Sequence, residues 1–234
     1  MAHIKRKLDR ARWRGTQKKW KLNLPAWLKP KLGPLLSKAE SKERFFARVE
    51  MIYPRTSADY ILIEKAYDTA QREFRNVVRD NGDQYFEHLR ASALFALVHL
   101  RVRDSNIIAA ILLHDIWEDF RDRWSFDRLV SEFNKEVAEL VYWVTKPAIG
   151  GMYKTKADVL RKYHRQLGHA PRKAILVKLC ERLHNLITIW EDDAPRTRSK
   201  VEETLNFHLT LAEEHCILVH EIEDVLKLIE SRLK

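Results

Sequence analysis

Helical periodicity runs through almost the whole chain after about residue 53, and it constrains the fold more than any other feature. Apolar residues recur at helical spacing from Asp59 to Arg79, and the Asn81-Gly82 pair ends that segment. Further helices are predicted over residues 85–101, 107–113, 126–133, 135–144, 154–167, 172–190 and 198–233. No segment alternates apolar and polar residues as a strand does, and no internal repeat is visible. The sequence therefore predicts an all-α bundle of about eight helices.

The third of these segments, residues 107–113, is apolar all round, so we expect it to be central and buried, with Asp104 or Ser105 as its cap. It is the longest apolar run, far short of the ~20 residues that span a bilayer. We therefore expect no membrane partner. The N-terminus lacks the apolar core of a secretory signal, and two cysteines do not form a disulfide framework. These features favour a reducing, cytoplasmic location.

Charge is distributed unevenly along the 234 residues, which carry a formal net charge of +10. Residues 1–50 hold 15 Lys and Arg against 4 Asp and Glu, whereas the other 184 residues hold 28 against 29. The sequence therefore predicts a basic N-terminal arm, residues 1–50, attached to a nearly neutral domain, residues 51–234. A composition of 45% hydrophobic residues with 6 Gly and 7 Pro is typical of a globular chain and excludes a disordered or collagen-like one.

The arm mixes its cations with Trp13, Trp20 and Trp27, and three prolines interrupt it. Aromatic rings among cations can stack on bases while the cations contact phosphates, as in single-stranded nucleic-acid binding. Alternatively, the tryptophans pack back onto the domain and the lysines are simply solvated. The sequence leaves both interpretations open.

Polar residues with metal-ligand chemistry follow the apolar segment 107–113 directly. His114, Asp115, Glu118 and Asp119 lie at its end, where burial of such groups is costly unless a cation is present. His114 and Asp115 are adjacent and can bind one ion from the same edge of the helix. Glu118 and Asp119 lie about one turn further on, within reach of a water on that ion. The pattern points to a divalent metal.

Other helices must supply further ligands, and two residues are suitably placed. His88 lies in the first turn of the helix predicted from residue 85. Glu181 belongs to a polar stripe with Lys178, Asn185 and Thr188 on an otherwise apolar helix. Taken singly, a His-Asp pair usually caps a helix or forms a hydrogen bond, and a lone histidine usually lies at the surface. Their combination on separate helices favours a metal site.

At this point the chain resembles the HD-domain hydrolases of the RelA/SpoT type and, in length, the small alarmone hydrolases. The resemblance covers about residues 59–212. Six groups of residues carry it in the family's order: 66–67, then 79–82 with 85–88, then 109–115 with 118–119, then 144–146, 177–185 and 203–205.

The resemblance implies roles for particular residues. His88, His114, Asp115 and Glu181 would hold one metal ion, usually Mn²⁺ in this family. Glu118 and Asp119 would orient and deprotonate the attacking water. Arg79 would lie against the base, Asn185 would contact the ribose, and Lys156 and Arg161 would offset phosphate charge. The implied reaction removes the 3′-pyrophosphate of (p)ppGpp. By this account, deletion of residues 1–41 should spare hydrolysis of a free nucleotide.

The chain departs from the family pattern at the rim of the site. Glu181 stands where the family has Asp, Gln84 and Asn81 replace Pro and Ser, Phe74 replaces a usual His, and Trp117 is bulkier than the common Val. The substrate is therefore less firmly indicated than the metal site.

Two alternatives remain beside the alarmone hydrolase. The same chemistry can act on pyrophosphorylated tRNA ends, as antitoxin relatives do, and the basic arm would suit tRNA. Alternatively, the exchange at Glu181 has left a silent module that binds nucleotide or a protein. Release of pyrophosphate from ppGpp that depends on Mn²⁺ would exclude the silent module.

Overall fold

A computed structural model describes residues 22–37, 40–79, 82–150, 155–189 and 194–233. Within these ranges the chain is helical, with an isolated bridge between Val78 and Gln84 and no strand, so the all-α prediction is confirmed. The helical elements are α2 (Lys29–Leu32), η1 (Gly33–Leu36), α3 (Lys42–Glu50), α4 (Ala58–Glu73), α5 (Tyr85–Leu94), η2 (Phe95–His99), α6 (Ser105–Leu113), α7 (Ile116–Asp119), α8 (Phe126–Glu132), α9 (Lys135–Val144), α10 (Lys156–Leu167), α11 (Arg172–Ile187), α12 (Ala194–Glu203), η3 (Thr204–His208), α13 (Leu209–His215) and α14 (Val219–Leu233).

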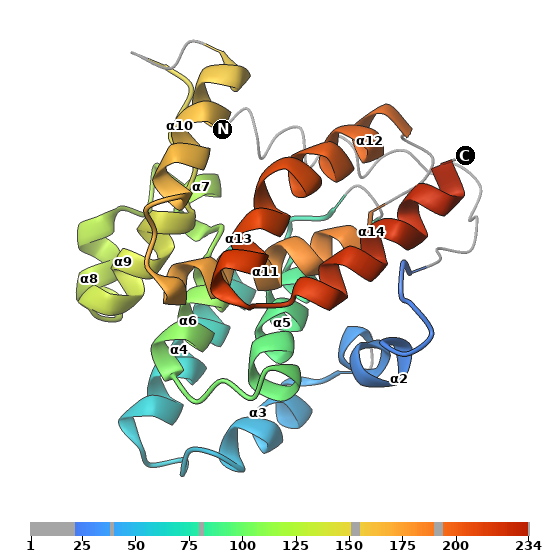
Figure 1. Ribbon diagram of the computed structural model, residues 1–234. Coiled ribbons are helices and arrows are strands. Elements are labelled where there is room, and N and C mark those ends of the chain that lie inside the picture. Colours follow the sequence, from blue (N-terminus) through green and yellow to red (C-terminus); the bar gives the residue numbers. More distant parts are fainter. Residues whose placement is uncertain (1–21, 38–39, 80–81, 151–154, 190–193, 234) are drawn as a thin grey trace.

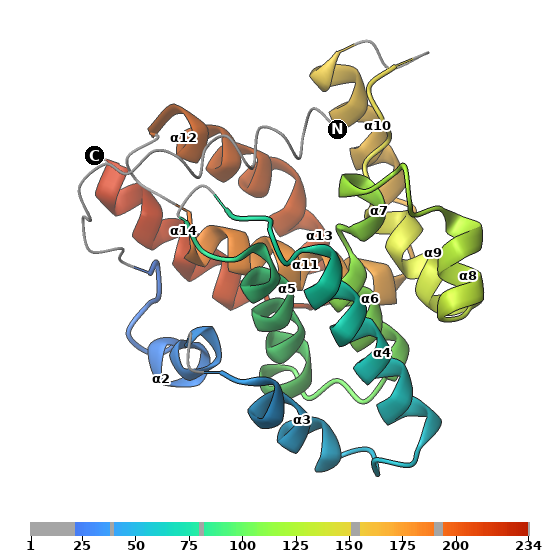
Figure 2. The same ribbon diagram turned by 180° about the vertical axis from the view of Figure 1, so that it is seen from behind.

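Helices α6 and α11 form the centre of the molecule. Helix α6 packs against α4, α5, α9 and α11, and all its residues from Ile107 to Leu113 are buried, as the sequence predicts. Helix α11 packs in addition against α13 and α14 (Figures 1 and 2). The stripe residues Lys178, Glu181 and Thr188 are also buried. Polar groups on α11 therefore face other helices rather than water.

Local capping chemistry explains several helix ends. The Asp104 carboxylate accepts hydrogen bonds from the backbone N–H groups of Asn106, at 3.0 Å, and Ile107, which makes Asp104 rather than Ser105 the cap of α6. The Asn134 side chain accepts from Val137 N at 2.9 Å and starts α9, whose bounds match the predicted 135–144. These ends follow from residue types that favour helix N-termini.

Two predicted helices are interrupted. The segment predicted over 85–101 changes to π-helical geometry at η2 and ends before Arg101, whose φ is 54°. The segment 198–233 was predicted as one helical stretch, but the structure divides it into α12, η3, α13 and α14. Cys216 and Leu218 adopt φ values of 52° and 56°, a left-handed conformation that reverses the chain and lays α14 against α11. No glycine or proline marks this turn in the sequence.

The described part of the predicted arm packs onto the domain. Leu28, Leu32 and Phe45 are fully buried in the same core as the helices that follow, so residue 50 does not separate two packed units. Asn23 is fully buried, and its side-chain amide donates to Leu186 O at 3.0 Å, at the end of α11. Arg90 of α5 donates to the carbonyl oxygens of Ser37 and Glu40. This part of the segment is therefore a component of the fold, and the division at residue 50 stays a prediction for residues 1–21, which lie outside the described residues.

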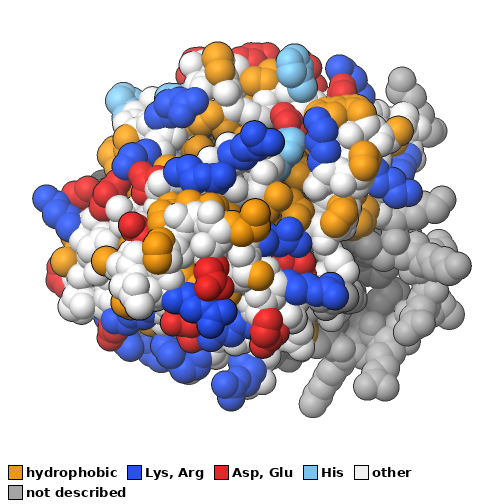
Figure 3. All heavy atoms as spheres, turned by 90° about the horizontal axis from the view of Figure 1, so that it is seen from below, with side chains coloured by type: hydrophobic (Ala, Val, Ile, Leu, Met, Phe, Trp, Pro, Cys, Tyr) orange, Lys and Arg blue, Asp and Glu red, His pale blue; other side chains and the backbone are white. Residues whose placement is uncertain are grey.

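The tryptophans of the arm divide in the same way. Trp27 is 39% exposed and donates its indole N–H to Asp224 Oδ2 at 2.9 Å, so it packs back against α14. Trp13 and Trp20 lie outside the described residues. On the face shown in Figure 3, Lys and Arg side chains are interspersed with Asp and Glu side chains. That mixture agrees with the near-neutral balance counted for residues 51–234.

Candidate metal and catalytic site

Three predicted ligands meet where α5 and the end of α6 face each other. His88 on α5 and His114 after α6 are buried, with their Nε2 atoms 3.3 Å apart. Asp115 Oδ2 lies 3.3 Å from His114 Nε2. One donor atom from each of the three residues lies within 4.8 Å of the others. The structure thus brings together side chains from positions 26 and 27 residues apart in the chain.

The end of helix α6 explains how His114 is oriented. Helix α6 stops at Leu113, and the His114 Nδ1–H donates to the carbonyl oxygen of Ile111 at 2.7 Å. A carbonyl oxygen only accepts, so Nδ1 carries a proton, and in the neutral form of the ring Nε2 presents its lone pair to the space beside His88 and Asp115. The short turn between α6 and α7, whose residues keep right-handed helical backbone angles, places Asp115 beside this nitrogen.

The pKa values of the two imidazoles are shifted in opposite directions. Burial lowers the pKa of His88 well below its usual value, and the nearby cation Arg79 adds to this effect. Burial alone would also lower the pKa of His114, but the carboxylates of Asp115 and Glu181 outweigh it and raise that pKa. The space beside His114 therefore favours positive charge.

Tyr85, at the start of α5, holds Asp115 in place. Its hydroxyl donates to Asp115 Oδ2, and its ring stacks on Phe74 with centroids 4.9 Å apart. Burial, reinforced by the charge of Asp115, raises the pKa of Tyr85 well above its usual value. Tyr85 therefore stays protonated and remains a donor to the carboxylate at neutral pH.

Glu181 on α11 is buried beside this group but is bound to its own helix. The Asn185 amide donates to Oε1, and Lys178 Nζ lies 2.8 Å from Oε2. Burial would raise the pKa of Glu181, but Lys178, Arg182 and His114 outweigh it and lower the pKa to about 2. Glu181 is thus a stable anion turned inward, although its oxygens are not among the three donors that converge.

The predicted nucleotide contacts Arg79 and Asn185 lie next to each other at the same site. Arg79 Nη2 donates to Asn185 Oδ1 at 2.7 Å, and Arg79 Nη1 lies 3.2 Å from His184 Nδ1. These residues link the loop before α5 to helix α11. Lys156 and Arg161, by contrast, are exposed on α10, and Arg161 pairs with Asp158 at 2.5 Å. Contact of these two cations with a substrate stays a prediction.

The two predicted acids on α7 have different surroundings. Glu118 accepts from the backbone N–H of Lys146 at 3.1 Å, and the Lys146 ammonium lies 3.3 Å from its Oε1. Asp119 is buried, and its charge contributes to the raised pKa of Tyr85. Asp119 therefore lies near Tyr85, the residue that holds Asp115, whereas the contacts of Glu118 are with Lys146.

Sequence reasoning missed three residues at the site: Tyr85, Lys146 and His184. Each stands inside a motif that the sequence analysis quotes, but none has ligand spacing of its own. His184 lies on the same predicted helix as the candidate ligand Glu181. A polar residue expected to be buried on such a helix is the signal that could have identified it. Nothing in the sequence alone indicates that Lys146 pairs with Glu118.

Two of the positions that depart from the family pattern, Phe74 and Trp117, have aromatic surroundings. Phe74 is fully buried against Tyr85 and Phe120. Trp117 lies against Phe126 and Tyr142, with centroid distances of 6.5 and 6.2 Å. The larger side chains at these two positions are therefore accommodated by aromatic packing.

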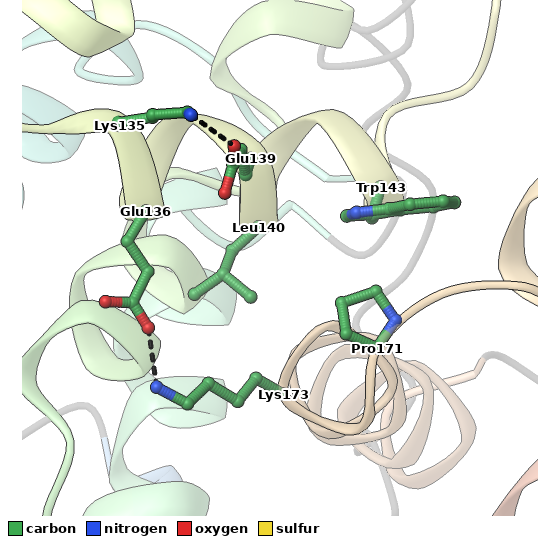
Figure 4. Close-up of a pocket in the computed structure, with 7 residues that line it drawn as sticks. All are labelled: Lys135, Glu136, Glu139, Leu140, Trp143, Pro171 and Lys173. Carbon is green, nitrogen blue, oxygen red and sulfur yellow. Dashed lines mark hydrogen bonds and ion pairs between the residues drawn. The ribbon is translucent and has the colours of Figure 1, made fainter.

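A separate hollow of about 430 Å³ lies between α9 and the start of α11 (Figure 4). Its charged residues are already paired: Lys173 Nζ lies 2.5 Å from Glu136 Oε1, and Lys135 Nζ lies 3.6 Å from Glu139 Oε1. It contains none of the candidate ligands. The candidate ligands therefore lie outside this hollow.

Comparison with known families matches the model of the HD domain to residues 66–217. The chain belongs to the HD-domain family. The match begins on α4 and ends after α13, so it includes each of the helices that carry the converging ligands.

Curated relatives of this HD domain are longer proteins. A guanosine-3′,5′-bis(diphosphate) 3′-pyrophosphohydrolase of Spiroplasma citri is 32% identical over 188 residues, which cover 78% of this chain and 24% of that protein. One of the same name from Aquifex aeolicus is 30% identical, covering 74% and 24%. A GTP pyrophosphokinase rsh of Brucella melitensis is 35% identical, covering 64% and 20%. This chain thus spans about a quarter or less of each.

A solved structure, described as a metazoan ortholog of SpoT that hydrolyzes ppGpp, has the same fold. It aligns with a TM-score of 0.62 at 20% sequence identity and covers 78% of this chain and 99% of its own. No helix among the described residues is long and apolar enough to cross a membrane.

HD domains are metal-dependent hydrolases, and the residues present here fit a divalent cation. Two imidazole nitrogens and a carboxylate oxygen converge in a buried space, and the surroundings of His114 favour positive charge. Imidazole and carboxylate ligands suit several first-row divalent ions. His88, His114 and Asp115 are therefore the residues that would hold the metal.

Proposed function

We propose that this HD domain is a pyrophosphohydrolase that removes the 3′-pyrophosphate of (p)ppGpp-type alarmones. The observation that carries the proposal is the group of His88, His114 and Asp115, whose donor atoms converge directly before helix α7, the helix that carries Glu118 and Asp119. The names of the curated relatives support the substrate class. Cleavage would form a bond from water oxygen to phosphorus and break the bond between phosphorus and the 3′-oxygen, releasing pyrophosphate.

We propose Mn²⁺ as the ion, with Glu181 as a further ligand beside His88, His114 and Asp115. When bound, such an ion supplies Lewis acidity to a phosphoryl oxygen and lowers the pKa of a water molecule. Glu181 is already an inward-facing anion, so release from Lys178 would free an oxygen for this purpose. Tyr85 keeps the Asp115 carboxylate in position.

Glu118 and Asp119 are proposed to orient the attacking water and accept its proton. A positioned carboxylate of this kind contributes about 10² to 10⁴ in rate. Lys146, paired with Glu118, and Lys178 both have their Nζ atoms over the ring of Tyr163, at 5.3 and 5.1 Å from its centroid. These two ammonium groups, which contact the same ring, are proposed to help place an anion such as pyrophosphate.

Arg79 and Asn185 are proposed to contact the nucleoside, because their mutual hydrogen bond places a guanidinium and an amide at one edge of the site. Lys156 and Arg161 remain proposed phosphate contacts from α10. Both are exposed, so they would act at the entrance rather than at the metal.

The direct test measures pyrophosphate released from ppGpp by the purified chain, with and without Mn²⁺, beside an Asp115→Ala variant. The expected result is turnover that requires the metal and is abolished in the variant. Absence of release from ppGpp, with metal verified in the protein, would contradict the proposal.

A second substrate, pyrophosphorylated tRNA, is favoured by one observation, the 15 Lys and Arg against 4 Asp and Glu in residues 1–50. Binding through many phosphate contacts weakens steeply as salt rises, whereas a free nucleotide makes few such contacts. Assay of both substrates between about 50 and 200 mM salt separates the two. If pyrophosphate is released only from the tRNA, at a rate that falls as salt rises, the proposed substrate is RNA instead of the alarmone. That result would support an antitoxin function.

We also propose that the protein acts in a reducing compartment, the cytoplasm. Cys180 is buried and Cys216 is exposed, and both are free thiols in the structure. Burial raises the pKa of the Cys180 thiol, which keeps it protonated and unreactive. Localisation of the tagged full chain tests this assignment.

A further inference from the structure

His184 lies directly behind the candidate ligand His88. It is buried on α11, and its Nδ1 atom is 2.8 Å from Nδ1 of His88, with ring centroids 4.7 Å apart. Nitrogen atoms at this distance share one proton, with one ring donating and the other accepting. Which ring donates determines which nitrogen of His88 is available to a metal.

The position of Arg79 decides the direction of this hydrogen bond. Its Nη1 atom lies 3.2 Å from the same His184 Nδ1. A guanidinium has only N–H donors and no acceptor, so His184 Nδ1 must present its lone pair. Because His184 Nδ1 accepts, the proton in the contact with His88 belongs to His88 Nδ1.

The consequence appears on the other side of the His88 ring. A neutral imidazole protonated at Nδ1 has a lone pair at Nε2, and His88 Nε2 is the atom that lies 3.3 Å from His114 Nε2. His114 has the same tautomer, since its Nδ1 donates to Ile111 O. When both rings are neutral, their two Nε2 lone pairs therefore face the same space, where a shared cation would bind both.

We propose that His184 is a positioning residue that keeps the proton of His88 on Nδ1 and thereby presents the Nε2 lone pair to the metal ion. The inference rests on the proposed metal site and adds a residue to it. His184 does not contact the ion. It acts through His88. Arg79 donates to His184 Nδ1 and so keeps that atom an acceptor for the His88 Nδ1–H. The arginine proposed to contact the nucleoside therefore also determines the tautomer of the ligand His88.

Two substitutions on the full chain separate this function from simple packing. His184→Leu fills a similar volume but offers no acceptor to His88. His184→Asn keeps an acceptor, because the Oδ1 atom of asparagine is bonded to Cγ, as Nδ1 is in histidine. Partners of this kind typically change metal affinity by about 10- to 100-fold when they are removed.

The affinity for Mn²⁺ is measured by the electron paramagnetic resonance signal of the free ion during titration, without substrate. We expect His184→Leu to weaken binding by about 10- to 100-fold, and His184→Asn to restore most of the loss. Circular dichroism and thermal melting verify that each variant is folded. Equal affinity in wild type and a folded His184→Leu would overturn the inference.

Nitrogen NMR of histidine in the metal-free wild-type chain gives an independent readout. We expect the His88 signals to show a protonated Nδ1 and a bare Nε2, and an inverted pattern would overturn the inference even if His184→Leu does not fold. Failure of wild type to bind Mn²⁺ would instead contradict the proposed metal site, while the NMR result would still decide the tautomer.

Discussion

Three of the candidate ligands and acids in this protein, Asp115, Glu118 and Glu181, are held by other polar side chains. Tyr85 holds Asp115, Lys146 holds Glu118, and Asn185 with Lys178 holds Glu181. The sequence predicts the residues with ligand chemistry because they stand at helix ends or in a polar stripe. It does not predict their partners, because a hydrogen bond between α5 and α7 depends on helix packing rather than on spacing within one helix.

Glu181 gives the sharpest prediction at this scale, since its charge and its length can be changed separately. Glu181→Gln removes the anion and leaves the buried Lys178 ammonium without its ion-pair partner. Removing one member of a buried ion pair costs about 3–5 kcal/mol, so we expect lower stability and weaker Mn²⁺ binding.

Glu181→Asp is the matched control, because it keeps the charge and restores the family's residue. We expect it to bind Mn²⁺ within about tenfold of wild type, as for a single altered contact worth about 1.4 kcal/mol. Titration of both variants with Mn²⁺ checks the pair. Normal metal binding by Glu181→Gln would exclude Glu181 as a ligand.

At the scale of elements, the helices are largely predictable and their interruptions are not. Helices α6 and α9 follow from an apolar run and from caps at Asp104 and Asn134. The reversal at Cys216 has no glycine to indicate it, and it is fixed instead by burial of Ile217 and Leu218 at the end of α13. Tertiary packing therefore overrides the local helical pattern there.

The contact between α11 and the end of α12 yields a second prediction. Arg182 is buried and donates to both carboxylate oxygens of Glu203, at 3.1 and 3.2 Å. Burial would raise the pKa of Glu203, but Arg182 and Lys200 outweigh it and hold this pKa well below its usual value. Glu203→Gln should therefore destabilise the fold by about 3–5 kcal/mol.

The pH dependence of this contribution follows from the sign of the shift. Because the pKa of Glu203 is lower in the folded state, its stabilisation is present at neutral pH and is lost as the pH falls below about 4.3, the value in an unfolded chain. Urea unfolding at pH 7 and at acid pH measures it. Glu202→Gln, at an exposed neighbour, is the control and should change little. Equal stability of the two variants at pH 7 would contradict the account.

At the scale of the whole molecule, the N-terminal segment is where the sequence prediction and the structure differ most. The number of charged residues distinguishes residues 1–50 from the rest of the chain. Charged side chains, however, lie on the solvent side of a helix, whereas its apolar face determines what the helix packs against. Leu28, Leu32 and Leu35 are buried in the common core, and the number of cations in the segment does not predict this burial.

Truncation tests the consequence. Loss of a single buried leucine side chain costs about 2–5 kcal/mol, so deletion of residues 1–41 should prevent stable folding rather than spare hydrolysis. Deletion of residues 1–21 keeps these leucines and Asn23 and should leave the melting temperature within about 4 °C of wild type. Melting curves of both truncated chains check this. If the chain that lacks residues 1–41 is folded and active, the result would instead support the prediction that the N-terminal segment is an arm independent of the domain.

The central claim is that the buried group of His88, His114 and Asp115 holds one divalent ion. The most direct measurement is elemental analysis of the purified chain after loading with Mn²⁺ and removal of free metal, for wild type and for Asp115→Asn. Asparagine keeps the size of the side chain and removes its charge. We predict one ion per wild-type chain and almost none in the folded variant. No retained ion in wild type, or an equal amount in both proteins, would contradict the account.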